Sequence, residues 1–170
     1  LGGGSFSSRI TKIVRTDNGL AYSTSSAFSA EPRYPGTFSA FCQTKNSTVV
    51  FAAQLMIREI ERMHAGEVTE RDLQFAKTAR MNAFPSMFST VFGNIRNFAR
   101  LELDGRPMDY YDTYLARYRK VTLADIKRVA REYLRPDQLV IMVAGNVEEC
   151  KAGAYQSLPN QSTIDAMAAL

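Results

Sequence analysis

Two side chains in the segment "VRTDNGLAYST", residues 14–24, are of types that bind oxygen atoms of other molecules. Arg15 and Tyr22 lie seven residues apart, and Gly19 stands between them. A guanidinium and a phenol hydroxyl are both hydrogen-bond donors, and both stay protonated near neutral pH. The alternative is structural: Arg15 satisfies carbonyl groups at a helix end, and Tyr22 is a half-buried strand side chain. The segment alone leaves both interpretations open.

Few other residues combine into a recognisable site. His64 is the only histidine, so the sequence has neither a zinc site built from several histidines nor a Ser-His or Cys-His pair beyond His64 itself. We interpret His64 as a surface or cap residue. Cys42 and Cys150 are too few for a disulfide framework, and whether they pair stays open. The "GGG" run at 2–4 lacks the Gly-Lys-Ser/Thr ending of a P-loop and the strand that precedes a dinucleotide motif.

The composition is that of an ordinary globular protein. The 170 residues are 45% hydrophobic and 22% charged, which suits one folded domain. The net charge of +4 comes from scattered residues, and we interpret the densest run, "RYRK" at 117–120, as a solvated helix end and not as a nucleic-acid site. No apolar run approaches the roughly 18 residues of a membrane span. The abrupt start at "LGGGS" suggests an excised or processed fragment.

The elements that must position Arg15 and Tyr22 are a helix and a hairpin. Apolar residues at helical spacing over 7–16, followed by Gly19, predict a helix that ends near Asn18. Alternating patterns over 20–30 and 37–44, with the turn "EPRYPG" between them, predict two strands of an antiparallel hairpin.

Helices dominate the rest of the sequence. Hydrophobic periodicity predicts helices over 47–64, from Thr69 to a break at Pro85, and over 88–103, 110–119 and 123–134. Thr69 with Asp72 forms a capping-box pattern, and Thr122 is a second N-cap. The apolar run "QLVIMVAGN" at 138–146 predicts a covered strand. The tail over 147–170 is weakly patterned, and we expect it to be weakly ordered.

This order of elements predicts an α+β fold for residues 1–146. We expect a two-layer sandwich, with helices packed on one face of a mainly antiparallel sheet. Three strands are few for so many helices, so we also expect the domain to be truncated at its N-terminus.

Three segments resemble the C-terminal-type domain of the insulinase and pitrilysin family of zinc metallopeptidases. They are "LGGGSFSSRITKIVRTDNGLAYS", "GEVTERDLQFAK" and "VTLADIKRVAREYLRPDQLVIMVAGN", which occur in the family's order and span residues 1–146. Enzymes of that family pair two related α+β domains or subunits around a chamber. One half carries a His-x-x-Glu-His motif that binds zinc. With a single histidine, this chain resembles the other half, which binds no metal.

The resemblance implies roles for particular residues. By motif match, Arg15 and Tyr22 are the arginine and tyrosine that the non-metal half contributes to substrate binding and to stabilisation of the oxyanion formed during peptide hydrolysis. Gly2, Gly3 and Gly4 resemble the glycine-rich loop of the non-catalytic subunit of mitochondrial processing peptidase, where it is associated with substrate handling, so they are candidates for substrate contact. A plain helix-entry turn explains them equally well. Thr16 departs from the family, which usually has an acidic residue after the arginine.

The resemblance therefore predicts an enzyme component: half of a zinc metalloendopeptidase, inactive without its zinc-bearing partner. We expect the partners to be a homologous His-x-x-Glu-His domain or subunit and a peptide substrate. The zinc ion is expected on the partner, and this chain is expected to bind no cofactor or nucleic acid and to have no membrane span. The alternative is a non-catalytic scaffold or assembly subunit of the same fold. The family leaves the compartment open, with the bacterial periplasm favoured over the cytoplasm.

Overall fold

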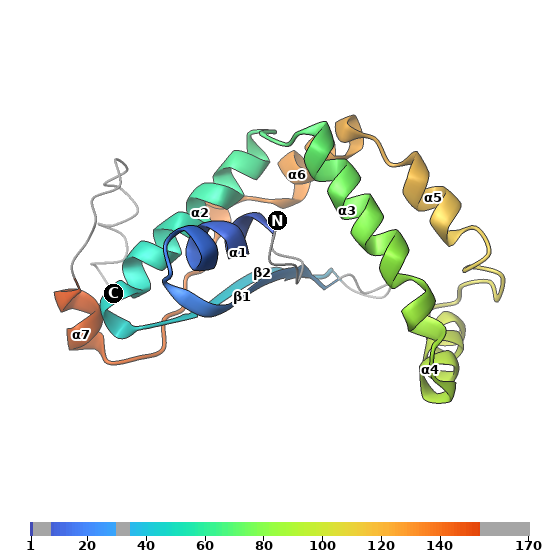
Figure 1. Ribbon diagram of the computed structural model, residues 1–170, viewed down its shortest axis with the longest axis horizontal. Coiled ribbons are helices and arrows are strands. Elements are labelled where there is room, and N and C mark those ends of the chain that lie inside the picture. The colour runs from blue at the N-terminus through green and yellow to red at the C-terminus, as the bar shows by residue number, and fades with distance from the viewer. Residues whose placement is uncertain (2–7, 30–34, 154–170) are drawn as a thin grey trace. The chain divides into compact units, whose positions relative to one another are not determined.

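The structure is a computed structural model that describes residue 1, residues 8–29 and residues 35–153. The chain falls into two compact units, which are described separately below. Unit 1 comprises Leu1–Gly66 and Ala130–Leu170, and unit 2 comprises Glu67–Val129. The predicted α+β class with an antiparallel sheet is confirmed (Figure 1).

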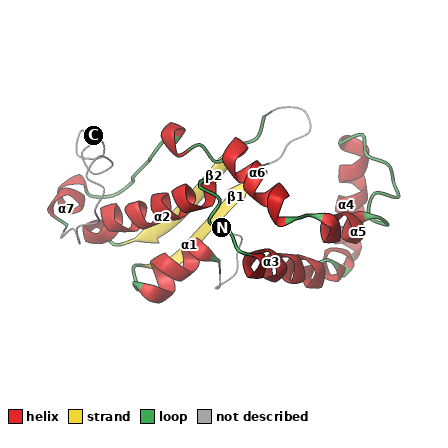
Figure 2. Ribbon diagram, turned by 90° about the horizontal axis from the view of Figure 1, so that it is seen from above, coloured by secondary structure: helices red, strands yellow, loops and turns green. Residues whose placement is uncertain are grey.

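Unit 1 contains the predicted helix, hairpin and long helix. The first helix, α1 (Arg9–Thr11), continues directly into a π-helix, η1 (Lys12–Asp17). Strands β1 (Ala21–Phe28) and β2 (Phe38–Thr44) then pair in antiparallel fashion. A 3₁₀ turn, η2 (Asn46–Thr48), leads into α2 (Val49–His64). Figures 1 and 2 show α1 and α2 beside the two-stranded sheet.

The main core of unit 1 lies between the sheet and these helices. Ala40 and Cys42 of β2 pack against a cluster of buried residues from α1, η1, β1 and α2: Ile10, Val14, Ala21, Ala52, Leu55 and Met56. Full burial of one such large aliphatic side chain stabilises the fold by about 1.5–3 kcal/mol. The core therefore holds the π-helix and the hairpin together from the inner face of the sheet.

A smaller cluster of unit 1 joins α2 to the segment that returns after residue 129. Ile60 packs with Ala130 and Leu134 near the end of α6 (Leu123–Tyr133). The Nδ1 atom of His64 lies 2.6 Å from the carbonyl oxygen of Leu134. Because a carbonyl oxygen only accepts, Nδ1 carries the proton and donates it. The partly buried His64 side chain therefore links the two segments by a hydrogen bond.

The strand predicted over 138–146 is wrong. A 3₁₀ turn, η4 (Pro136–Gln138), is followed by a segment that forms no strand, and α7 (Val147–Ala152) begins at the cap residue Asn146. A strand exists only where its backbone pairs with a neighbour. In the described part of the chain β1 and β2 pair with each other alone, so Val140 and Met142 remain 85% and 88% exposed.

Unit 2 is helical and contains α3 (Glu70–Ala83), η3 (Pro85–Phe88), α4 (Val91–Leu103), α5 (Tyr114–Lys120) and the first part of α6. The predicted capping box at Thr69 and Asp72 is present in both directions. The helix expected over 110–119 begins only at Tyr114, because 110–113 form successive turns.

Aromatic side chains pack against one another between these helices: Phe84, Phe88, Phe98, Tyr110, Tyr111, Tyr114 and Tyr118.

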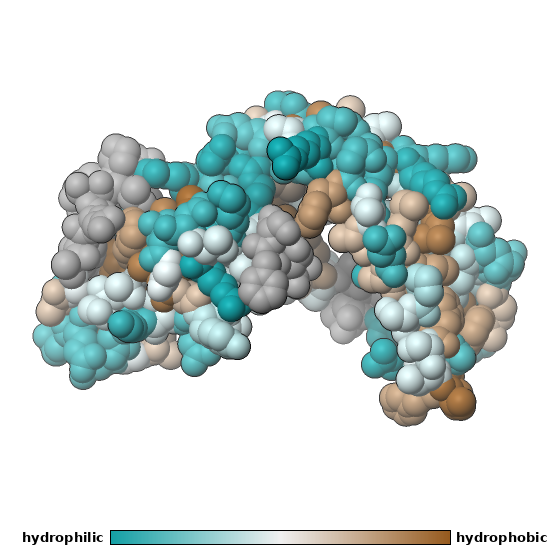
Figure 3. All heavy atoms as spheres, in the orientation of Figure 1, coloured by the Kyte–Doolittle hydropathy of each residue, from teal (hydrophilic) through white to brown (hydrophobic). Residues whose placement is uncertain are grey.

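One face of α4 is apolar and exposed. Val91, Phe92, Ile95 and Leu103 are 62–78% exposed, and Figure 3 shows hydrophobic side chains gathered over α4. The opposite face is buried through Leu101, among others. No helix in the described ranges combines the length and the apolar character that crossing a membrane requires.

Candidate functional site

Arg15 lies in the π-helix that ends just before β1. The two neighbouring apolar residues Ile10 and Val14 are completely buried and hold this helix against the core. Residues 12–17 follow the wider π-helical turn, which is rare and often found at functional sites. The wider turn changes the angle at which the residues of η1 leave the helix surface, Arg15 included.

The end of η1 is closed by the three residues that follow it. Gly19 has a φ of +61°, a conformation that a glycine adopts without strain, and its N–H donates to the Arg15 carbonyl at 3.0 Å. The N–H of Leu20 donates to the Val14 carbonyl at 2.9 Å. The Asn18 side chain donates to the Ile13 carbonyl at 2.7 Å. Backbone N–H groups and the Asn18 side chain thus cap the helix end.

Tyr22 occupies a β-bulge. In the hairpin, Ala21 is opposite Thr44, while Ser23 is opposite Gln43, so Tyr22 is an extra residue on β1. A bulge interrupts the ladder locally and redirects the side chain of the extra residue. Tyr22 accordingly leaves the half-buried pattern of β1 and is 84% exposed.

The structure brings Arg15 and Tyr22 together. The central carbon of the Arg15 guanidinium lies over the Tyr22 ring, 4.8 Å from its centroid. This is the geometry of a cation–π contact, which stabilises an exposed pair by about 0.5–1 kcal/mol. The two side chains therefore present a cation and a phenol hydroxyl at one place on the surface of unit 1.

Hydroxyl groups connect the helix of Arg15 to the strand of Tyr22. Thr11 is 6% exposed, and its Oγ1 atom lies 2.9 Å from the Thr24 hydroxyl, which donates to it. Ser8 donates to the same Oγ1 atom at 2.7 Å. The Thr44 hydroxyl of β2 donates to the Leu20 carbonyl at 2.7 Å, beside the start of β1. These bonds fix the spacing of the two elements from the buried side.

The predicted site residues differ in what the structure says of them. The proximity expected for Arg15 and Tyr22 is observed, while their role in substrate binding stays a prediction. Gly2, Gly3 and Gly4 lie outside the described residues. Sequence reasoning missed the π-helix and the bulge. The "NG" at 18–19 signalled the helix stop, but no residue type marks Tyr22 as an extra residue in the ladder.

The described residues contain no group of three His, Cys, Asp or Glu side chains arranged to hold a metal ion. The donor set of the described chain therefore does not fit zinc, which takes at least three protein ligands. Cys42 and Cys150 are both free and partly buried. Burial raises the pKa of the Cys42 thiol, so this thiol is a poor nucleophile at neutral pH.

The chain is similar to proteins of one family. A family model described as the peptidase M16 inactive domain matches residues 1–80. The N-terminal half of the chain therefore matches the M16 inactive-domain family. This match confirms the predicted resemblance to the non-metal half of the insulinase and pitrilysin peptidases. It includes η1, β1, β2 and α2, and thus both Arg15 and Tyr22.

A curated relative also matches most of the chain. A protein of Helicobacter pylori described as the non-peptidase homolog YmxG is 24% identical over 151 residues. The match covers 88% of this chain and 34% of that protein. The chain thus spans about a third of the length of this relative.

Solved structures share the fold. A crystal structure of a peptidase M16 inactive domain from Pseudomonas fluorescens has a TM-score of 0.72 and 21% identity, covering 81% of this chain and 32% of that one. The structure of a protease from Helicobacter pylori has a TM-score of 0.65 and 20% identity, covering 81% and 33%. At this identity the similarity shows the fold.

One expectation from the sequence is wrong. We expected the chain to be an enzyme component of the zinc metalloendopeptidase type. The matching family model is described as an inactive domain, and the curated relative is described as a non-peptidase homologue. Both descriptions contradict the expectation of an enzyme component.

Proposed function

We propose that this chain is a metal-free, non-catalytic half of an M16-type assembly. It pairs with a homologous domain or subunit and contributes Arg15 and Tyr22 to the binding of a peptide held between the two halves. The observation that carries the proposal is the exposed stack of the Arg15 guanidinium on the Tyr22 ring, 4.8 Å from its centroid.

The chemistry of the pair suits a peptide backbone. A phenol hydroxyl donates one hydrogen bond, and a guanidinium offers several N–H donors in a fixed plane. Both groups match the acceptor that every peptide bond presents, its carbonyl oxygen. A hydrogen bond to a neutral partner is worth about 0.5–1.5 kcal/mol net, and a bond that involves a charged group about 1.5–3 kcal/mol.

The backbone irregularities around the pair support this role. A π-helix carries Arg15, and a β-bulge carries Tyr22. Both features interrupt regular hydrogen bonding, and both occur often beside functional sites, where they redirect a side chain. Both features fall within eleven residues, 12–22.

In this proposal zinc belongs to the partner. The described residues do not fit the ion, and the sequence contains one histidine. A His-x-x-Glu-His motif on the homologous half would hold the metal. This chain would contact the peptide from its own side, and we assign no hydrolytic step to its residues.

Peptide binding by the assembled pair tests the proposal. The chain is mixed with a homologous His-x-x-Glu-His domain, and sedimentation velocity measures whether a complex forms. The anisotropy of a fluorescein-labelled, extended and uncharged peptide then reports affinity. Tyr22→Phe removes the hydroxyl and keeps the ring, so the dissociation constant is expected to rise about 3–10-fold, equivalent to about one hydrogen bond.

A matched control separates the hydroxyl of Tyr22 from tyrosine hydroxyls in general. Tyr133 is also exposed, at 58%, and Tyr133→Phe should leave the affinity unchanged. A wild-type dissociation constant for Tyr22→Phe would refute the role of Tyr22 in peptide binding. Failure of the two halves to associate would refute the pairing.

The second candidate is a scaffold that pairs with a homologous subunit and binds no peptide. The description of the curated relative as a non-peptidase homologue favours it. The two candidates differ in one outcome of the same experiment. A scaffold forms the complex, but the labelled peptide binds no more tightly to the complex than to the partner alone.

A further inference from the structure

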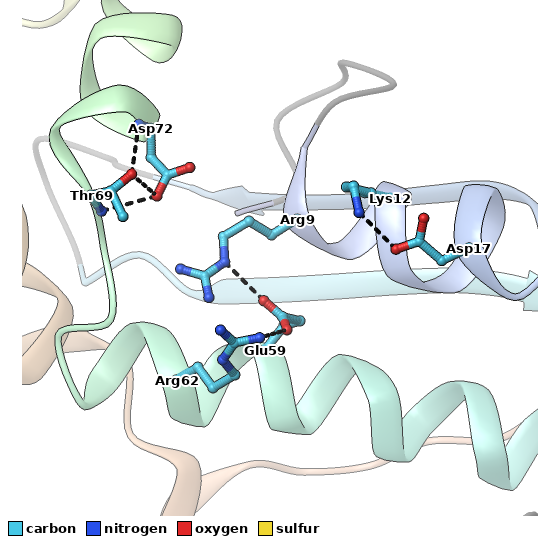
Figure 4. A network of polar contacts seen from close by, with 7 residues as sticks. All are labelled: Arg9, Lys12, Asp17, Glu59, Arg62, Thr69 and Asp72. Carbon is cyan, nitrogen blue, oxygen red and sulfur yellow. Dashed lines mark hydrogen bonds and ion pairs between the residues drawn. The ribbon is translucent and has the colours of Figure 1, made fainter.

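A buried carboxylate on α2 is bonded to the helical segment that continues to Arg15. The side chain of Glu59 on α2 is only 4% exposed, and two arginines bind it (Figure 4). Arg9 Nε donates to one carboxylate oxygen at 2.8 Å, and Arg62 Nη1 donates to the other at 2.9 Å.

The two arginines play different parts. Arg62 lies three residues after Glu59 on the same helix and has a half-exposed side chain, so its bond to Glu59 stays within α2. Arg9 comes from α1, fifty residues earlier, and its side chain is 18% exposed. The bond from Arg9 therefore ties α1 to α2 at a buried point, where a charge pair is strongly directional.

A continuous helical segment links Arg9 to Arg15. The chain runs from α1 into η1 without a break, so Arg9 and Arg15 belong to one short helical rod over 9–17. Ile10 and Val14 hold this segment against the core by apolar contacts, which carry less directional preference than a charge pair. Thr11 and Thr24 fix the rod to β1, while Arg9 and Glu59 fix it to α2.

We propose that Glu59 is a positioning residue for the Arg15–Tyr22 pair. Through Arg9, it sets the rotation of the helical rod, so that the Arg15 guanidinium lies over the ring on the bulge of β1. The geometric part of this inference stands independently of peptide binding. Its consequence for affinity rests on the proposed function.

Ring-current shifts test the geometry directly. Because the Arg15 guanidinium lies over the Tyr22 ring, the NMR signals of the Arg15 side-chain protons are expected upfield of their position in Tyr22→Ala, which defines the value without the ring. Arg9→Met keeps an apolar arm and removes the bond to Glu59, and the Arg15 signals should move at least halfway toward that value. Arg9→Lys keeps a cation within reach of the carboxylate and should restore much of the shift.

Arg62→Gln is the matched control. It removes the other arginine of Glu59 and leaves the bond from Arg9, so the Arg15 signals should stay near the wild-type position. An unchanged Arg15 shift in Arg9→Met would overturn the proposal. An equal displacement in Arg62→Gln would also overturn it, because the effect would then come from α2 in general. Glu59→Gln provides a second variant with the same expected direction as Arg9→Met.

Peptide affinity separates this inference from the proposed function. If both hold, Arg9→Met raises the dissociation constant of the assembled pair about 3–10-fold, because the two donors are no longer aligned. A displaced Arg15 signal with unchanged affinity would support positioning and contradict the peptide-binding role. A wild-type Arg15 signal in Arg9→Met, together with a loss of affinity in Tyr22→Phe, would contradict positioning by Glu59 and support the peptide-binding role.

Discussion

Arg15 and Tyr22 hold each other only weakly at the surface. Their cation–π contact lies in an exposed place and is worth about 0.5–1 kcal/mol, little more than thermal energy. The backbone and the buried bonds therefore help to define where the pair lies. Thr11 lies on the buried side of the same helical segment, and its hydroxyl oxygen accepts hydrogen bonds from the Ser8 and Thr24 hydroxyls.

A second residue-scale device closes the start of α6. Asp125 accepts from the backbone N–H of Thr122 at 2.9 Å and from its hydroxyl at 2.6 Å, and the Asp125 N–H donates back to that hydroxyl. These bonds favour the ionised carboxylate and lower the pKa of Asp125. The cap is therefore a charged capping box, equivalent to the one at Thr69 and Asp72.

The pKa of Asp125 predicts a pH dependence. Because its value in the folded chain lies below that of an ordinary aspartate, the cap stabilises α6 above the unfolded pKa, and this stabilisation is lost as pH falls through the folded pKa. Thr122→Ala removes the hydroxyl bond, so the pKa should rise toward the ordinary value. Carbon-13 NMR of the Asp125 carboxyl measures both titrations, and identical curves would contradict the assignment.

At the scale of elements, local signals predicted helices well and strand partners poorly. The stop at Gly19 and the caps at Thr69 and Thr122 are where the sequence placed them, because each depends on residues within one turn. The apolar run at 138–146 resembled a strand by composition, yet a strand needs a neighbour supplied by distant residues. For the same reason the bulge at Tyr22 was invisible, since it depends on the register with β2.

The same holds for the candidate site: its local features could be predicted from the sequence, and its long-range contacts could not. Residue types and spacing pointed to Arg15 and Tyr22, and the helix stop explained how both reach one edge of the hairpin. The contacts that hold the pair in place were not predictable. The bond from Arg9 to Glu59 joins residues fifty positions apart, and no local pattern links them.

Helix α4 offers a test of its two faces. Leu101 is 2% exposed, so Leu101→Ala should lower the free energy of unfolding by about 2–5 kcal/mol through lost contacts and a cavity. Ile95 lies on the exposed face at 63%, and Ile95→Ala should change it by less than about 0.5 kcal/mol. Urea unfolding followed by far-UV circular dichroism measures both. Equal costs would mean that the apolar face of α4 is covered in solution.

At the scale of the whole molecule, the two compact units are built on different cores. Unit 1 buries aliphatic side chains between a sheet and helices, as at Leu55. Unit 2 packs aromatic rings between helices, and few of its aliphatic residues are buried, Leu73 among them. The candidate site and its supporting bonds all lie in unit 1, within residues that match the M16 inactive domain. Substitutions that destabilise unit 2 should therefore leave the contact between Arg15 and Tyr22 unchanged.

Native-state hydrogen exchange tests this separation. Leu55→Ala should reduce the protection of amides in β1 and β2 by the equivalent of about 2–5 kcal/mol, because it opens a cavity in the core beneath them. Amides of α3 should keep their wild-type protection. Leu73→Ala should reduce the protection of α3 amides and leave that of β1 and β2 at the wild-type level. The NMR signals of the Arg15 side chain should not shift in this variant. A uniform loss across β1, β2 and α3 in either variant would show that the two cores unfold together, and unit 2 would then contribute to the stability of the site.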